Sequence, residues 1–122
     1  MILADTSIWV DHFRSGNDEL RKQLINRRIV MHPFIVGELA LGSLSKRAAT
    51  LAYLEHLPSV RVARLDEVRR MVEARSLYSQ GIGLIDAHLI ASVFINPSTQ
   101  LWTRDKRLRC VAESLGIHAN LP

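Results

Sequence analysis

The sequence predicts an α/β fold in which a mostly parallel sheet is flanked by helices on both faces. Short apolar runs alternate with longer stretches of helical periodicity along the whole chain. The connections between them are short and rich in capping and turn residues. No repeat, low-complexity stretch or linker interrupts the pattern, so the 122 residues are expected to form a single domain, 1–122.

The first half of the chain predicts two strands and four helices. Pro33 fits the first turn of a helix, where its missing N–H costs nothing, and Gly42 is expected to end that helix. Thr6 and Ser7 are expected to supply the N-cap of the first helix. In chain order we expect a strand at 2–5, a helix from there to the turn at 16–17, a helix at 18–27, a strand at 29–31, a helix at 33–42 and a helix from 45 to Pro58.

The second half continues the alternation. Asp66 is expected to cap a long amphipathic helix that ends at Gly81 and Gly83. The stretch 84–95 is apolar almost all round, which is typical of a central helix. We expect the remaining elements to be a strand at 60–62, a strand at about 100–103, a helix capped by Asp105 that runs to Leu115, and a short strand at 117–119.

The composition limits the class of protein. The charged fraction is 23% and the hydrophobic fraction 48%, as in ordinary globular proteins. With one cysteine the chain has no internal disulfide, and Cys110 is expected to be a small apolar residue on a packed helix. We see no secretory leader and no apolar stretch long enough for a bilayer, so we expect a cytoplasmic protein without membrane contact.

Four acidic residues, Asp5, Glu38, Asp86 and Asp105, are the candidate site. Asp5 and Asp105 follow predicted strands, whereas Glu38 and Asp86 interrupt apolar helical faces. The carboxyl edge of an open α/β sheet is where such folds build their sites. Each of the four has a separate structural explanation, such as capping or pairing with an arginine. A shared divalent cation explains all four at once.

Hydroxyl and basic side chains accompany these acids. Thr6 lies beside Asp5 and Thr103 lies two residues before Asp105, so both are expected to support the carboxylates. The net charge is +4, and an acidic pocket within a basic surface suits a polyanion such as RNA. The basic residues beside the last acid, which are expected to approach that polyanion, are Arg104, Lys106 and Arg107. No histidine spacing resembles a zinc site, and all five histidines are interpreted as structural or surface residues.

The ordered set of motifs resembles the PIN-domain ribonucleases, and most closely the VapC toxins of bacterial toxin–antitoxin pairs. The resemblance covers essentially the whole chain. The motifs that carry it are Ile-Leu-Ala-Asp5-Thr6-Ser7, Val36-Gly37-Glu38-Leu39, Gly83-Leu84-Ile85-Asp86-Ala87-His88-Leu89-Ile90-Ala91 and Leu101-Trp102-Thr103-Arg104-Asp105. The chain is short for this family between Gly42 and Asp66, which affects the helical hairpin expected there.

The resemblance implies a three-layer α/β/α sandwich and endonucleolytic hydrolysis of RNA that depends on Mg²⁺ or Mn²⁺. It implies that Asp5, Glu38, Asp86 and Asp105 form the catalytic quartet, with Thr103 in support. We expect Asp5 and Asp86 to be the direct metal ligands. A cognate VapB-like antitoxin and a homodimer are also implied.

Two other classes were compared with this interpretation. A phosphatase of the haloacid dehalogenase type requires an Asp two positions after Asp5, where Ser7 stands, and a receiver domain requires an Asp after the strand that here precedes Ala63. The alternative from a different class is a non-catalytic PIN-like module that binds RNA or protein. Uptake of magnesium or manganese distinguishes an enzyme from such a scaffold.

Overall fold

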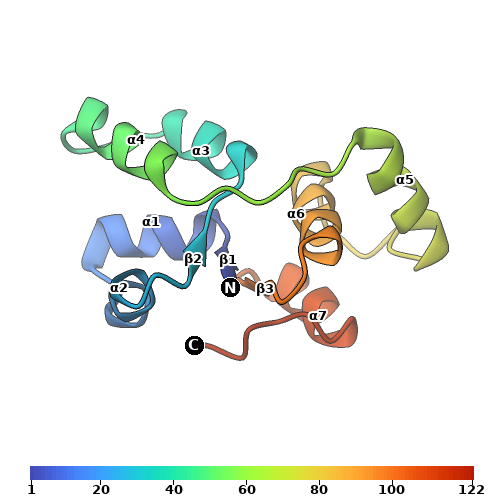
Figure 1. The fold of residues 1–122 in the computed structure, drawn as a ribbon. Coiled ribbons are helices and arrows are strands. Elements are labelled where there is room, and N and C mark those ends of the chain that lie inside the picture. The colour runs from blue at the N-terminus through green and yellow to red at the C-terminus, as the bar shows by residue number, and fades with distance from the viewer.

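Three short parallel strands cross the centre of the molecule in the order β2-β1-β3 (Figure 1). They are β1 (Ile2–Ala4), β2 (Ile29–Val30) and β3 (Gln100–Trp102) in a computed structural model that describes residues 1–122. In the central strand, Leu3 is in register with Val30 on one side and Leu101 on the other. The predicted parallel sheet is therefore confirmed.

Seven helices surround this sheet. Figure 1 shows α1 and α2 on one side of the strands and α6 and α7 on the other. Helices α3 and α4 pack together, and α5 packs against α6. Between Gly42 and Asp66, where the chain is short for the family, α4 is the one complete helix. The helices are α1 (Thr6–Ser15), α2 (Asp18–Ile25), α3 (Pro33–Ala40), α4 (Arg47–His56), α5 (Leu65–Ala74), α6 (Leu84–Ile95) and α7 (Lys106–Ser114).

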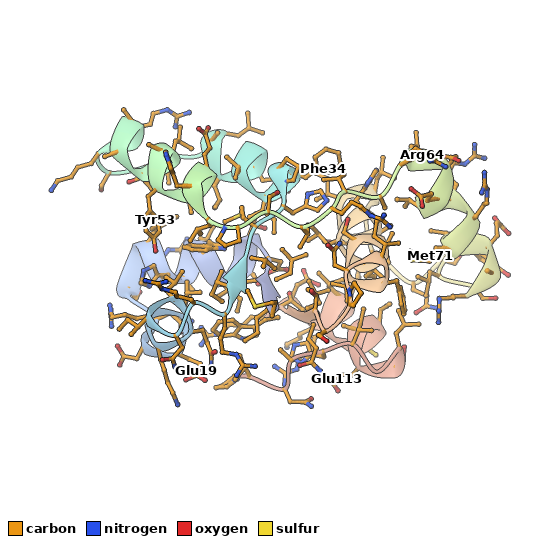
Figure 2. The ribbon with its side chains drawn as sticks, viewed as in Figure 1. Glu19, Phe34, Tyr53, Arg64, Met71 and Glu113 are labelled. Atoms are coloured by element: carbon orange, nitrogen blue, oxygen red, sulfur yellow. The ribbon has the colours of Figure 1, made fainter.

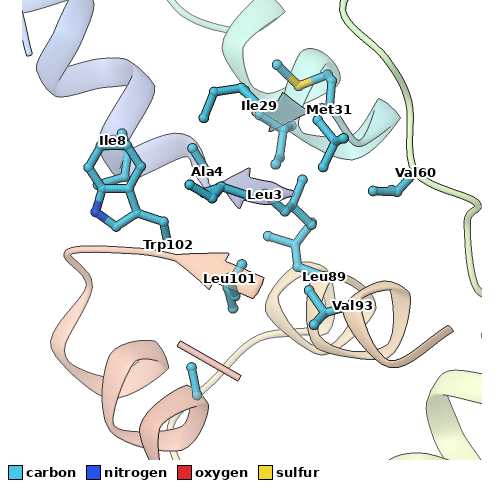
Figure 3. Packing of buried hydrophobic residues seen from close by; sticks show 14 of the residues in the cluster. Leu3, Ala4, Ile8, Ile29, Met31, Val60, Leu89, Val93, Leu101 and Trp102 are labelled. Atoms are coloured by element: carbon cyan, nitrogen blue, oxygen red, sulfur yellow. The ribbon is translucent and has the colours of Figure 1, made fainter. Parts of the chain in front are cut away.

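The core lies between the strands and the helices on either side. All three residues of β1 are buried, because helices cover both faces of the sheet and leave no face for polar side chains. Figure 3 shows Leu89 and Val93 of α6 beside Leu3, with Ile8 of α1 near Trp102. Burial of one such large apolar side chain stabilises the fold by about 1.5–3 kcal/mol. Helix α6 is buried from Ala87 through Val93, which confirms its predicted central position.

The strand predicted at 60–62 is wrong. Only an isolated parallel bridge between Met31 and Ser59 forms at this edge. Instead, the side chain of Asn96, just after α6, forms hydrogen bonds with both backbone groups of Arg61. Its Oδ1 accepts from the Arg61 N–H at 2.9 Å, and its Nδ2 donates to the Arg61 carbonyl at 2.8 Å. The strand predicted at 117–119 is likewise reduced to one bridge, between Leu101 and His118.

Two predicted helix starts differ from the structure. Helix α5 begins at Leu65 and Arg64 is its N-cap, with the Glu67 carboxylate accepting from the Arg64 N–H at 2.9 Å. Asp66 lies inside the first turn, where it pairs with Arg64 and Arg70, so it is not the cap. The helix also ends at Ala74, well before Gly81. The first helix is capped by Asp5 rather than by the two hydroxyl residues that follow it.

Two further observations concern the surface. Cys110 is exposed on α7, so the predicted packed position is wrong; the buried side of this helix carries Leu108, Val111 and Ala112 instead. None of the helices has both the length and the apolar character that crossing a membrane requires.

Buried histidines form part of the fold. His32 is 0% exposed and caps α3, because its Nδ1 accepts from the Phe34 N–H at 3.0 Å. The Phe34 ring lies between the two imidazoles, 5.0 Å from His32 and 4.8 Å from His88. Burial, and then the charge of His88, lower the pKa of His32 to about 4. His32 is therefore neutral in the folded protein under neutral and mildly acidic conditions.

We expect His32 to make the protein less stable at mildly acidic pH. The unfolded chain gains a proton at position 32 as the pH falls below about 6.5, while the folded protein does not gain it until about pH 4. The free energy of unfolding should therefore fall by about 2 kcal/mol between pH 7 and pH 5 through this residue. Urea denaturation of the wild type and of His32→Asn, whose side chain retains a capping acceptor, measures the difference.

His56→Asn is the matched control, because His56 is exposed on α4. We expect that variant to keep the full pH dependence of the wild type. An equal loss of stability in His32→Asn and the wild type would contradict the role given to His32.

Candidate functional site

The four predicted acids come from four different segments that meet at the carboxyl edge of the sheet. Asp5 directly follows β1 and caps α1, and Asp105 follows β3 and caps α7. Asp86 lies in the first turn of α6, and Glu38 lies near the end of α3. Asp5 is buried, Glu38 and Asp86 are partly exposed, and Asp105 is exposed. Asp86 is partly exposed although it interrupts an apolar helical face, because the first turn of α6 opens onto the surface.

The carboxylate of Asp5 is the most enclosed of the four, with a residue exposure of 4%. Its Oδ1 accepts from the Ser7 backbone N–H at 3.0 Å and from the Ser7 hydroxyl at 2.5 Å. Its Oδ2 accepts from the Thr103 hydroxyl at 2.6 Å. Burial raises the pKa of Asp5, and the hydrogen bonds from Ser7 and Thr103 counteract part of that rise.

The same two hydroxyls connect β1 with the turn after β3. The Thr103 Oγ1 accepts from the Asp105 N–H at 3.0 Å while it donates to Asp5. The Ser7 Oγ accepts from the Arg104 N–H at 3.0 Å while it donates to the other oxygen of Asp5. Each hydroxyl therefore fixes the Asp5 carboxylate and the backbone of the loop that carries Asp105.

Mutual repulsion links the four carboxylates into one cluster. The pKa of Glu38 is raised by burial, then by the negative charge of Asp86 and then by that of Asp5. The pKa of Asp86 is raised by burial and by the charge of Asp105, although the Gly83 N–H, 3.3 Å from its Oδ2, lowers it. The six ion pairs of the structure all involve other acids, so no arginine or lysine neutralises this cluster.

Comparison with known proteins agrees with this arrangement. Residues 2–114 match the model of the PIN domain family. The chain is 40% identical over 117 residues to Ribonuclease VapC32 of Mycobacterium tuberculosis, in both the CDC 1551 / Oshkosh and the ATCC 25618 / H37Rv strains. Each alignment covers 96% of this chain and 94% of the relative.

This chain belongs to the PIN domain family. The family model covers all four segments that carry the acids, because the first of these acids, Asp5, and the last, Asp105, both lie within residues 2–114. The α/β fold with a parallel sheet that the sequence predicted is the fold observed here.

The donor set of this PIN domain is suitable for a hard divalent cation. All four candidate ligands supply carboxylate oxygens, which Mg²⁺ and Mn²⁺ prefer. A cation between them would relieve the repulsion that raises the pKa values of Glu38 and Asp86. The side chains stand apart in this arrangement, and no three acidic, histidine or cysteine side chains are close enough together to hold a metal ion.

Ser7, rather than Thr6, donates to Asp5. Thr6 makes no hydrogen bond to that carboxylate and instead lines a recess of about 480 Å³ together with Glu38 and Phe13. Capping geometry distinguishes the two, because the side chain of an N-cap residue accepts from the second or third residue of the helix. Ser7 is that second residue, so the sequence contained the signal.

Arg104 does not reach toward the acids. Its Nη1 pairs with the Asp11 carboxylate at 2.7 Å, and its Nε donates to the Pro122 carbonyl at 2.9 Å. Of the three basic residues predicted to approach a polyanion, Lys106 and Arg107 make no ion pair. The free positive charge beside the cluster therefore lies in the first turn of α7.

We expect Thr103→Val to disturb the site through Asp5. The change removes the hydrogen bond that lowers the pKa of Asp5 and leaves the Asp105 N–H without its acceptor. The pKa of Asp5 should rise further, and the protein should lose about 1–3 kcal/mol of stability at neutral pH. NMR titration of the Asp5 carboxyl carbon and urea denaturation measure the two effects.

Thr103→Ser is the control, because it keeps the hydroxyl and should restore both quantities almost to wild-type values. A Thr103→Val protein with an unaltered Asp5 titration would show that this hydroxyl does not support the carboxylate.

Proposed function

We propose that this PIN domain is a Mg²⁺- or Mn²⁺-dependent endoribonuclease and the toxin of a VapBC-type toxin–antitoxin pair. The observation that carries the proposal is the cluster of four carboxylates, which comes from four segments and has no basic partner within the protein. Buried or crowded negative charge of this kind is costly unless a cation compensates it. The similarity to relatives named as ribonucleases gives independent support.

In this proposal all four acids contribute to the binding of the cation. Asp5 and Asp86 are its direct ligands, and Glu38 and Asp105 complete its surroundings directly or through water. When bound, such an ion lowers the pKa of a coordinated water and offsets charge that develops on a phosphodiester. Ser7 and Thr103 hold the Asp5 carboxylate in one orientation. Asp105 is exposed and is therefore accessible to water and to the RNA strand.

We expect Asp5→Asn to abolish cleavage without unfolding the protein. The amide keeps the shape of the carboxylate and one acceptor for the hydroxyls around it, but it removes the charge that attracts the cation. Cleavage of labelled RNA should fall by at least about 100-fold, the equivalent of several kcal/mol of transition-state stabilisation. Calorimetric titration with Mg²⁺ or Mn²⁺ should show weaker uptake, and a chelator should stop the wild-type reaction.

Asp66→Asn is the matched control, since Asp66 is exposed and pairs with arginines on α5, away from the cluster. That variant should cleave RNA at the wild-type rate. If Asp5→Asn also cut RNA at that rate, the assignment of the site would fail. If the wild type took up no divalent ion and cut no RNA, the non-catalytic binding module would be the correct interpretation.

The exposed apolar surface between α1, α2 and α4 is where we place the antitoxin. Phe13 is 41% exposed and separates two recesses, one lined by Glu38 and Leu39, the other of about 360 Å³ lined by Ile25 and Tyr53. Tyr53 extends from α4 toward α1 (Figure 2). Adjacent exposed aromatic and aliphatic side chains are typical of protein interfaces. A partner seated there would also restrict access to Glu38, which explains inhibition.

We expect Tyr53→Ala to weaken inhibition by the antitoxin while leaving cleavage intact. Loss of an aromatic anchor at an interface costs about 2 kcal/mol or more, so the antitoxin concentration needed for half-inhibition should rise about 30-fold or more. Tyr78→Ala provides the comparison, because Tyr78 is also exposed but lies outside both recesses. Equal inhibition of both variants would place the antitoxin elsewhere.

We also propose that the chain forms a homodimer and acts in the cytoplasm, where RNA and a co-produced antitoxin are both present. Light scattering of the purified chain, with and without its antitoxin, measures the oligomeric state.

A further inference from the structure

The basic residues at the start of α7 fall into two groups. Arg104 is held by Asp11, and Arg109 is held by Glu113, with its Nε 2.7 Å from the Glu113 carboxylate. Lys106 and Arg107 are exposed and make no ion pair. Only Lys106 and Arg107 therefore carry a positive charge that is not paired with an acid of the protein.

The side chain of Arg107 packs over a glycine. It lies across Gly81, where a β-carbon would be 2.7 Å from the Arg107 Cδ, 3.1 Å from Nη1 and 3.2 Å from Nε. A side chain at position 81 would therefore displace the Arg107 side chain, which is flexible and can move away. Gly81 also has a φ of +77°, a conformation that favours glycine.

The contact joins the two segments that carry Asp86 and Asp105. Gly81 lies two residues before Gly83, whose N–H donates to the Asp86 carboxylate. Arg107 lies two residues after Asp105, the cap of its own helix. Asp86 and Asp105 repel each other, yet the guanidinium forms an ion pair with neither. The Arg107 side chain thus lies over the segment that leads to Asp86, and its guanidinium pairs with neither acid.

We propose that Arg107, which packs over Gly81, binds an RNA phosphate next to the one that is cut. This inference rests on the proposed ribonuclease function. A planar guanidinium can donate two parallel hydrogen bonds to a phosphate, and that of Arg107 is not paired with any acid of the protein. The carboxylates repel the RNA backbone unless positive charge flanks them, and Arg107 supplies it at the edge formed by α6 and α7.

Binding of RNA in the absence of cleavage provides the test. The Asp5→Asn protein is mixed with a fluorescein-labelled single-stranded RNA of mixed sequence, and fluorescence anisotropy gives the Kd between about 50 and 200 mM salt. Adding Arg107→Gln should weaken binding by about 3–10-fold and reduce the slope of log Kd against log salt by about 0.7, the value for one phosphate contact on a single strand. Arg109→Gln removes the same charge from the same helix, but at a residue that is already paired with Glu113, and should change Kd less than about two-fold.

A second variant tests the positioning without removing charge. Gly81→Ala fills the space under Arg107 and should weaken RNA binding in the same direction as Arg107→Gln. Its control is Gly116→Ala, at a φ of +71°, where a β-carbon would meet no atom within 4 Å. Both alanines replace a glycine at a positive φ and should lower the midpoint of thermal unfolding to a similar extent, but only the one at position 81 should weaken RNA binding.

The outcomes separate the two proposals. Equal effects of Arg107→Gln and Arg109→Gln, or of Gly81→Ala and Gly116→Ala, would overturn the role of Arg107 and leave the nuclease function untouched. Failure of the wild type to cut RNA in a chelator-sensitive way would overturn the nuclease function whatever the binding data show. Undetectable RNA binding by Asp5→Asn at the lowest salt would also overturn the role of Arg107.

Discussion

The carboxylate of Asp5 lies almost out of contact with water at the end of the central strand, and the hydroxyls of Ser7 and Thr103 make that position tolerable. An enclosed carboxylate without donors is destabilising by several kcal/mol. Here Oδ1 accepts from the hydroxyl of Ser7, in the first turn of α1, and Oδ2 accepts from the hydroxyl of Thr103, directly after β3. The geometry of the whole site depends on this arrangement, because the same hydroxyls fix the backbone of the loop that leads to Asp105.

The four acids also act on one another. The pKa of Glu38 is raised first by burial, then by the charge of Asp86 and last by that of Asp5, while the charge of Asp105 raises the pKa of Asp86. Of the basic residues near this edge, Arg104 is held by Asp11 and Arg109 by Glu113, while Lys106 and Arg107 make no ion pair. No basic side chain therefore neutralises the cluster. A protein with a net charge of +4 therefore presents an acidic centre surrounded by basic residues, the distribution that suits a polyanion and a cation together.

The sequence predicted those parts of the fold that depend on local pattern. The buried strand at Ile2–Ala4 and the central helix Leu84–Ile95 are continuous apolar runs of different length, and both were predicted correctly. The strand at 60–62 was predicted wrongly, because the side chain of Asn96, 35 residues away, forms hydrogen bonds with both backbone groups of Arg61. The start of α5 was misplaced because both Asp66 and Glu67 are acidic, and only the geometry shows that Glu67 completes the cap.

Local sequence pattern also limits what could be predicted of the candidate site. Acids that follow strands can be located from the chain order, whereas the partners of Arg104 depend on where Asp11 lies in space. The exposure of Cys110, by contrast, could have been predicted, since at 3.6 residues per turn it lies on the side of α7 opposite Leu108, Val111 and Ala112.

The hydrogen bonds of Asn96 also affect how the molecule behaves toward its own copies. The segment from Ser59 to Arg61 is the outermost part of the sheet beyond β2, and such a margin normally leaves amide and carbonyl groups free to recruit another polypeptide. Because Asn96 satisfies both groups of Arg61, that margin offers no template for a further strand. The side chain of Asn96 thus disfavours the addition of a strand from another molecule at this edge of the three-stranded sheet.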